Sequence, residues 1–369
     1  MDGALTAGIL WLDLCRKRSN KRRHFGGLKV IVPGGKERTT AERMAWLNHT
    51  KSSFQLYTLD EQSEVLQTVD FRDTGNVESR LVHAFSPEAA MERCQAGVSR
   101  VLTLIPEEAR ARVEVLASSA SEVGLSLHGL EFARVRHGFG PHSFAGQDEI
   151  SFGAGPNATP LNDENEGQFR SLLEQLFRSR HPHGFHTDAV FRLQPERWLE
   201  ARIRRCLREI FDGLREDHVY SQVPALSAGE RGLLDLLALD REGRLTILEL
   251  KADEDLHLPL QALDYWIRVR ALNDDRAFAQ ASERGRALSA FERAGYFPGA
   301  EVSVRAPKLL LIAPALRIHP ANKTVLQYFS PQVEWELIAL NEHWRRELKV
   351  VFRQRAGQGE DQRLVGTGS

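Results

Sequence analysis

The sequence has few cysteines, no long apolar run and almost no net charge. Its three cysteines, Cys15, Cys94 and Cys206, are too few and too widely spaced for a disulfide framework or a zinc-binding pair, which fits a reducing cytoplasm. The apolar stretch LTAGILWLDLC (residues 5–15) is too short to cross a bilayer and contains Asp13. Basic residues follow that stretch, whereas a secretory signal has them before it. We therefore expect a cytoplasmic protein with no membrane span.

The balance of charge excludes no class of partner. Lysine plus arginine number 49 and aspartate plus glutamate 50, so the net charge is -1. Attraction for nucleic acid must come from local patches. The basic run at residues 16–23 could contact nucleic acid, although such runs are more often solvated tails. A Walker phosphate loop is absent, because PGGKER (33–38) has glycines and a lysine at the wrong spacing.

A chain of 369 residues is long enough for about two domains. Changes in composition and apolar pattern suggest where they begin and end. We expect a basic N-terminal tail (1–27), an N-terminal α/β or α+β domain (28–137), a Gly-, Pro- and Asn-rich linker (138–165), a second domain (166–355) and a disordered polar tail (356–369).

Three charged residues interrupt two predicted apolar strands. Residues 232–239 and 244–251 should form a hairpin around the turn DREG. With the turn centred on residue 242, Asp235 lies opposite Glu249, and facing side chains have Cβ atoms about 4.5–5.5 Å apart. Lys251 projects from the same face as Glu249, because side chains alternate along a strand. A slip of one residue would separate these groups.

Two facing carboxylates in apolar surroundings repel each other unless a positive charge compensates. Lys251 could form an ion pair with one of them. A hard divalent cation such as Mg²⁺ (or Mn²⁺) would satisfy both and keep positions for water and phosphate. The lysine could then orient or deprotonate an attacking water, which predicts metal-assisted hydrolysis of a phosphodiester. The alternative is an edge strand with solvated charges, but Leu233, Leu237 and Ile247 make this face apolar.

Two predicted helices flank the hairpin and carry further polar residues. The helix after it has Gln261, Tyr265 and Arg268 on one side, at i, i+4 and i+7. Such a line suits a phosphate backbone and its bases, although an amphipathic surface has the same spacing. In the helix expected over residues 195–214, Glu200 borders the apolar stripe.

These residues together resemble the PD-(D/E)xK phosphodiesterase superfamily, in particular its RecB-type branch with a Q-x-x-x-Y helix. The resemblance covers roughly residues 195–316 and implies a restriction-endonuclease-like αβββαβ core with a central mixed sheet. Its last strand would be residues 307–316, followed by strands at 333–340 and 348–353. One residue departs from the family pattern, since Leu234 stands where the motif has proline.

The resemblance also implies roles for individual residues. The metal ligands would be Asp235, Glu249 and the carbonyl of Leu250, and Glu200 would complete the site or hold a second ion. Lys251 would position the attacking water. The residues that support the site and bind the substrate would be Gln261, Tyr265 and Arg268.

The sequence therefore predicts a Mg²⁺-dependent nuclease with DNA as its expected substrate, in which the N-terminal domain serves substrate choice or regulation. Cutting of both strands would favour a homodimer. Two alternatives stay open: a catalytically silent nuclease-like module that binds nucleic acid or protein, and a nuclease effector gated by a small ligand near RDTGN (72–76). The sequence does not distinguish DNA from RNA, single from double strands, or internal from terminal cutting.

Overall fold

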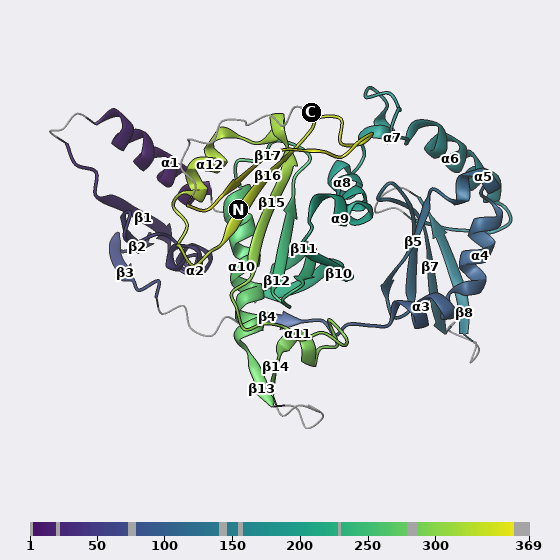
Figure 1. The fold of residues 1–369 in the computed structure, drawn as a ribbon, viewed down its shortest axis with the longest axis horizontal. Coiled ribbons are helices and arrows are strands. Elements are labelled where there is room, and N and C mark those ends of the chain that lie inside the picture. The colour runs from purple at the N-terminus through teal and green to yellow at the C-terminus, as the bar shows by residue number, and fades with distance from the viewer. Residues whose placement is uncertain are drawn as a thin grey trace. The chain divides into compact units, whose positions relative to one another are not determined.

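The computed structural model describes residues 3–19, 23–72, 79–139, 146–153, 158–227, 230–278 and 286–357. The chain is divided into two units, each discontinuous in sequence. Unit 1 comprises Met1–Val82, Leu207–Glu342 and Lys349–Ser369, and unit 2 comprises His83–Cys206 and His343–Leu348 (Figure 1). The expected α/β class is confirmed, because both units combine sheets with helices. No helix among these residues is long and apolar enough to cross a membrane.

Unit 1 contains a seven-stranded mixed sheet in the order β17-β16-β15-β12-β11-β10-β4. Its strands are β4 (Ser79–Leu81), β10 (Leu214–Ser227), β11 (Glu230–Asp240), β12 (Leu245–Leu250), β15 (Lys308–Pro314), β16 (Trp335–Leu340) and β17 (Val350–Arg355). The meander β10-β11-β12 is antiparallel, whereas β12, β15 and β16 are parallel. Every residue of β12 and β16 is buried, as expected for parallel strands covered on both faces. The strands expected at residues 307–316, 333–340 and 348–353 are confirmed as β15, β16 and β17.

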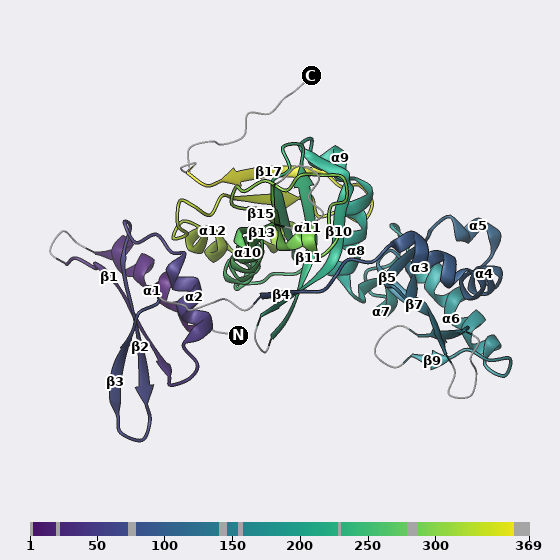
Figure 2. The same ribbon diagram turned by 90° about the horizontal axis from the view of Figure 1, so that it is seen from below.

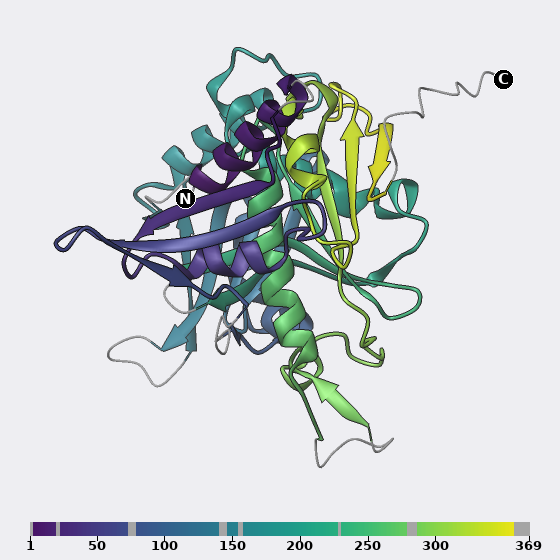
Figure 3. The same cartoon turned by 90° about the vertical axis from the view of Figure 1, so that its left-hand side faces the viewer.

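The long helix α10 (Leu258–Asp274) packs against β12 and β15. Its apolar residues are buried nearly all the way round, and the indole Nε1 of Trp266 donates a hydrogen bond to the Pro307 carbonyl at 2.8 Å. Shorter elements of the unit are α9 (Leu207–Ile210), β13 (Arg276–Phe278), β14 (Ala287–Ser289), α11 (Ala290–Arg293), η1 (Ala315–Arg317) and α12 (Pro320–Leu326). Figure 3 shows α10 running beside the N-terminal elements of the same unit.

Those N-terminal elements form a small sheet and two helices: α1 (Gly3–Arg18), β1 (Gly27–Pro33), α2 (Arg38–Ala45), β2 (Ser53–Asp60) and β3 (Val65–Val69). The strands β1 and β2 are parallel and β2 pairs with β3 as a hairpin (Figure 2). Arg43 on α2 binds Asp264 on α10 through two hydrogen bonds of 2.8 and 2.7 Å. This pairing joins the N-terminal segment to the sheet-bearing part of unit 1.

Residues 3–18 differ from the expected tail. They form α1, in which Leu5, Ile9 and Leu12 recur at i, i+4 and i+7 and are buried. The apolar stripe packs on β1 and α12. The free energy gained by burying this stripe holds the segment as a helix, although its last turn carries basic residues. The polar C-terminal tail lies, from residue 358 on, outside the described residues.

Unit 2 has a five-stranded antiparallel sheet in sequence order, β5-β6-β7-β8-β9. Its elements are α3 (Pro87–Arg93), α4 (Gln95–Thr103), α5 (Glu107–Arg110), β5 (Val113–Ser119), β6 (Glu122–Leu127), β7 (Leu130–Phe139), β8 (Gly146–Phe152), β9 (Thr159–Pro160), α6 (Glu166–Ser179), α7 (Ala189–Arg192) and α8 (Pro195–Arg205). The stretch expected as a linker thus contains β8 and β9, and Ile150 and Phe152 of β8 belong to the core of the unit.

The two units also divide residues 28–137 differently from the expected N-terminal domain. Residues 28–82 belong to unit 1 and residues 83–137 to unit 2. The reason is that α2 and the loop after it have their packing partners on α10, more than 200 residues later in the chain.

Candidate functional site

The β11–β12 hairpin has the register that the sequence predicted. Leu236 pairs with Leu248, one step before Asp235 and Glu249. Asp235 also contacts the next residue of the neighbouring strand, because its Oδ2 accepts a hydrogen bond of 2.9 Å from the Leu250 N–H. The carboxylate of Asp235 is therefore fixed at the end of β12 where Glu249 lies.

The turn between the strands sets this register. Asp240 Oδ1 accepts hydrogen bonds from the N–H groups of Glu242 at 2.9 Å and Arg244 at 2.8 Å. Gly243 has a φ of 76°, in the left-handed region that glycine favours. A Cβ at this position would lie 2.1 Å from the Glu301 carbonyl oxygen, so no residue with a side chain fits at position 243.

Glu249 and Lys251 place opposite charges at the carboxyl end of β12. The Glu249 side chain is 2% exposed and that of Lys251 is 12% exposed, and Lys251 Nζ lies 3.7 Å from Glu249 Oε1. The Lys251 main chain is held by the neighbouring strand, because its N–H donates to the Ile312 carbonyl at 3.0 Å. A charge pair with so little exposure is costly to desolvate, so its presence inside an apolar sheet calls for an explanation.

The helix α10 brings Tyr265 to the two carboxylates. Burial raises the pKa of the Tyr265 phenol, and the negative charges of Glu249 and, more weakly, Asp235 raise that pKa further. The Gln261 amide donates to the Tyr265 hydroxyl at 3.5 Å. The Arg268 guanidinium lies 5.9 Å from the centre of the Tyr265 ring. Of the polar line predicted on this helix, Tyr265 lies near the hairpin charges, and Gln261 and Arg268 lie beside Tyr265.

Glu200, also predicted as a metal ligand, belongs to unit 2, whereas the hairpin belongs to unit 1. It lies on α8, is 5% exposed, and its Oε2 is 3.2 Å from Arg197 Nη1. The residues that the structure brings together in unit 1 are Asp235, Glu249, Leu250, Lys251, Gln261, Tyr265 and Arg268.

Asp255 is a neighbour of the site that the sequence analysis missed. Its Oδ2 lies 4.0 Å from Lys251 Nζ. Its Oδ1 accepts a hydrogen bond of 2.7 Å from the His257 N–H, and its carbonyl accepts one of 3.1 Å from the Asn322 amide. Asp255 stands four residues after Lys251. That spacing predicts a contact within a helix, but these residues lie in the turn that follows β12, so the sequence did not indicate the contact.

Asp235, Glu249 and the Leu250 carbonyl offer the hard oxygen donors that Mg²⁺ prefers. No group of three or more His, Cys, Asp or Glu side chains that could hold a metal ion occurs in the described part of the chain. A cation at the hairpin would therefore complete its shell with water and phosphate. This fits Mg²⁺, which commonly has one or two carboxylate ligands and keeps several waters.

Comparison with known proteins assigns no family, because no protein-family model matches the chain and no curated protein matches it in sequence.

Proposed function

We propose that unit 1 is a metal-dependent nuclease of the PD-(D/E)xK type, acting in the cytoplasm on nucleic acid, with DNA as its substrate. The observation that carries the proposal is the register of β11 and β12, which brings Asp235 and Glu249 to adjacent positions with Lys251 beside them. Burial of such charges in an apolar sheet is unfavourable unless an opposite charge or a bound cation compensates them.

The order of elements in unit 1 supports this proposal. Three antiparallel strands, β10, β11 and β12, are followed by α10 and then by β15, which lies parallel to β12. This is the order of strands and helix expected of the family core after its first helix. The charged residues also lie at the carboxyl end of β12, where ligands of sheets with parallel strands commonly bind.

Each residue of the site has chemistry that suits phosphodiester hydrolysis. Asp235 and Glu249 offer carboxylate oxygens to a divalent metal, and a bound metal supplies Lewis acidity and lowers the pKa of its water. Lys251 offers a cation at the carboxylates, where it can orient a water or meet a phosphate oxygen. Because its pKa is raised, Tyr265 stays a neutral phenol and can donate a hydrogen bond to an anionic oxygen. Arg268 extends positive charge along α10.

A second candidate function is a catalytically silent module that binds nucleic acid or protein. The observation in its favour is that the described residues gather no third ligating side chain at the hairpin. In that case the Lys251–Glu249 pair neutralises the buried charge by itself. Titration with Mn²⁺ separates the two candidates, since the silent module would bind no metal. The ligand-gated alternative depends on RDTGN (72–76). Of these residues, 73–76 lie outside the described part of the chain.

A cleavage assay tests the proposal. The full-length protein is incubated with labelled single- and double-stranded DNA and RNA in Mg²⁺, Mn²⁺ or EDTA. Lys251→Ala is compared with Lys36→Ala, a matched change at an exposed lysine in the turn after β1. We expect metal-dependent cutting by the parent and the control, and a loss of about 100-fold or more with Lys251→Ala. Equal cutting by a folded Lys251→Ala protein would contradict the assignment. Sedimentation of the active protein shows whether a homodimer accompanies cutting of both strands.

A further inference from the structure

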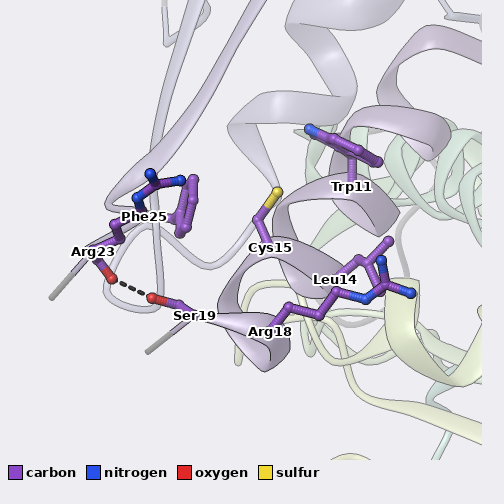
Figure 4. A pocket seen from close by; sticks show the side chains of 7 residues that line it. All are labelled: Trp11, Leu14, Cys15, Arg18, Ser19, Arg23 and Phe25. Atoms are coloured by element: carbon purple, nitrogen blue, oxygen red, sulfur yellow. Dashed lines mark hydrogen bonds between the residues drawn. The ribbon is translucent and has the colours of Figure 1, made fainter. Parts of the chain in front are cut away.

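A pocket of about 400 Å³ lies in unit 1 between α1 and the segment that leads into β1 (Figure 4). Its lining residues are Trp11, Leu14, Cys15, Arg18, Ser19, Arg23 and Phe25. Those from α1 up to Arg18 recur at i, i+3, i+4 and i+7, so they share one face of the helix. The volume lies within the range of small-ligand sites in proteins.

Hydrogen bonds from side chains of the helical wall to main-chain carbonyls hold the two walls of the pocket together. Arg16 donates from Nε to the Phe25 carbonyl at 2.9 Å and from Nη2 to the Gly26 carbonyl at 3.2 Å. The Ser19 hydroxyl donates to the Arg23 carbonyl. Residues 23–26 are therefore tied to α1 without use of the side chains of Trp11, Arg18, Arg23 and Phe25, so the pocket exists before a ligand binds.

The chemistry of the lining is aromatic and cationic. Trp11 is 66% exposed, which is unusual for the largest apolar side chain, and Phe25 stands on the opposite wall. Arg18 and Arg23 contribute guanidinium groups from the two walls. In the part of the chain that the structure describes, neither guanidinium has a carboxylate partner. None of the described residues that line the pocket is acidic.

A ligand that satisfies both features has a flat aromatic ring and a phosphate. Aromatic side chains stack on nucleobases regardless of base identity, and guanidinium groups bind phosphate oxygens by paired hydrogen bonds. We propose that this pocket binds a nucleotide, with the base against Trp11 and Phe25 and the phosphate at Arg23, whose guanidinium lies beside Phe25 (Figure 4).

The pocket and the hairpin site are connected within unit 1 by α1. At the other end of the helix, Thr6 Oγ1 lies 3.4 Å from Nδ1 of His257, the residue that precedes α10. About 18 Å of helix rise separates Thr6 from Arg18. If the proposed nuclease function holds, the pocket lies where it can hold a nucleotide of the substrate strand away from the bond being cut. Binding of a free nucleotide would use the same chemistry.

The test measures binding in EDTA, so that it does not depend on cleavage. Fluorescent adenosine monophosphate and a short labelled oligothymidylate are titrated with the full-length protein, Trp11→Ala, Arg23→Gln, and Arg317→Gln as a matched control at an exposed arginine outside the pocket. We expect Trp11→Ala to weaken binding by about 5- to 150-fold, Arg23→Gln to weaken it and flatten its salt dependence, and the control to change it less than twofold. Thermal unfolding checks that each variant is folded.

Cys15 gives an independent readout, because it lines the pocket and is partly exposed. Bound nucleotide should slow its reaction with maleimide, while Cys206, also partly exposed, reacts at an unchanged rate. Binding of the free nucleotide alone, or of the oligonucleotide alone, supports the proposal and tells which form the ligand takes. Absence of binding by both probes, or equal affinity in parent and pocket variants, overturns it. Since no cutting is involved, the pocket and the proposed nuclease can fail separately.

Discussion

Replacement of Lys251 by alanine should destabilise unit 1, quite apart from any effect on catalysis. The Glu249 carboxylate is 2% exposed, and Lys251 Nζ at 3.7 Å is a cation close to it. Removing one partner of a buried ion pair costs about 3–5 kcal/mol, because the other charge stays desolvated. Lys251 keeps 12% of its surface exposed, and the distance is longer than in a close ion pair. We therefore expect a loss at or below the lower end of that range, about 2–3 kcal/mol.

Thermal unfolding in EDTA measures this loss. For a unit of about 150–250 residues, each kcal/mol shifts Tm by about 2–4 °C, so Lys251→Ala should unfold about 4–12 °C below the parent. The double variant Lys251→Ala with Glu249→Gln has no buried charge at this position and should recover much of the shift. Mg²⁺ should stabilise Lys251→Ala more than the double variant, by about 2.7 kcal/mol at one hundred times the dissociation constant.

A Lys251→Ala protein whose Tm in EDTA lies within 1 °C of the parent and is not raised by the second change would refute a stabilising role for the Lys251–Glu249 pair. Groups other than Lys251 would then balance the Glu249 charge, and the two carboxylates would need no bound cation for their stability. The same measurement protects the cleavage assay, because it shows whether an inactive Lys251→Ala protein is still folded.

Two further predictions concern the turn of the hairpin and the core of unit 2. Gly243→Ala should lower Tm by several degrees and reduce any cleavage, because its Cβ would overlap the Glu301 carbonyl; a Tm like that of the parent would show that the turn can shift. In unit 2, burial and then the positive charges of nearby arginines lower the pKa of His128 to about 3. The unfolded histidine titrates near 6.5, so the stability from neutral His128 is complete above pH 6.5 and is lost as pH falls toward 3. His128→Asn, which tolerates the φ of 47° at this position, should weaken the fall of Tm between pH 6.5 and 4; equal slopes would contradict the burial argument.

The hairpin could be predicted because its determinants are local. The DREG turn holds Asp240 at one end and Gly243 at the position that needs a positive φ, and the apolar strands β11 and β12 adjoin it directly. The register then follows without knowledge of the rest of the fold. The line of residues on α10 could be predicted for the same reason, since helical spacing alone puts Gln261 and Tyr265 on one side.

The division of the chain could not be predicted, because it depends on partners far apart in sequence. Nothing near Arg43 indicates that it binds Asp264, and nothing near Trp46 indicates that its ring meets Trp266 at 4.7 Å. Strand β8 was hidden for a different reason. Its buried side chains are few and lie among glycine, proline and asparagine, so composition outweighed the alternation of Ile150 and Phe152.

The contacts of α10 also give a physical basis for a regulatory role of the N-terminal segment. Asp264, which binds Arg43 of α2, is followed in sequence by Tyr265, which faces the hairpin carboxylates. The Arg43 side chain is 8% exposed and its bond to Asp264 is bidentate, so α2 and α10 are held in one relative position. If the proposed nuclease is regulated by its N-terminal segment, the Arg43–Asp264 contact between α2 and α10 is a direct route to the site.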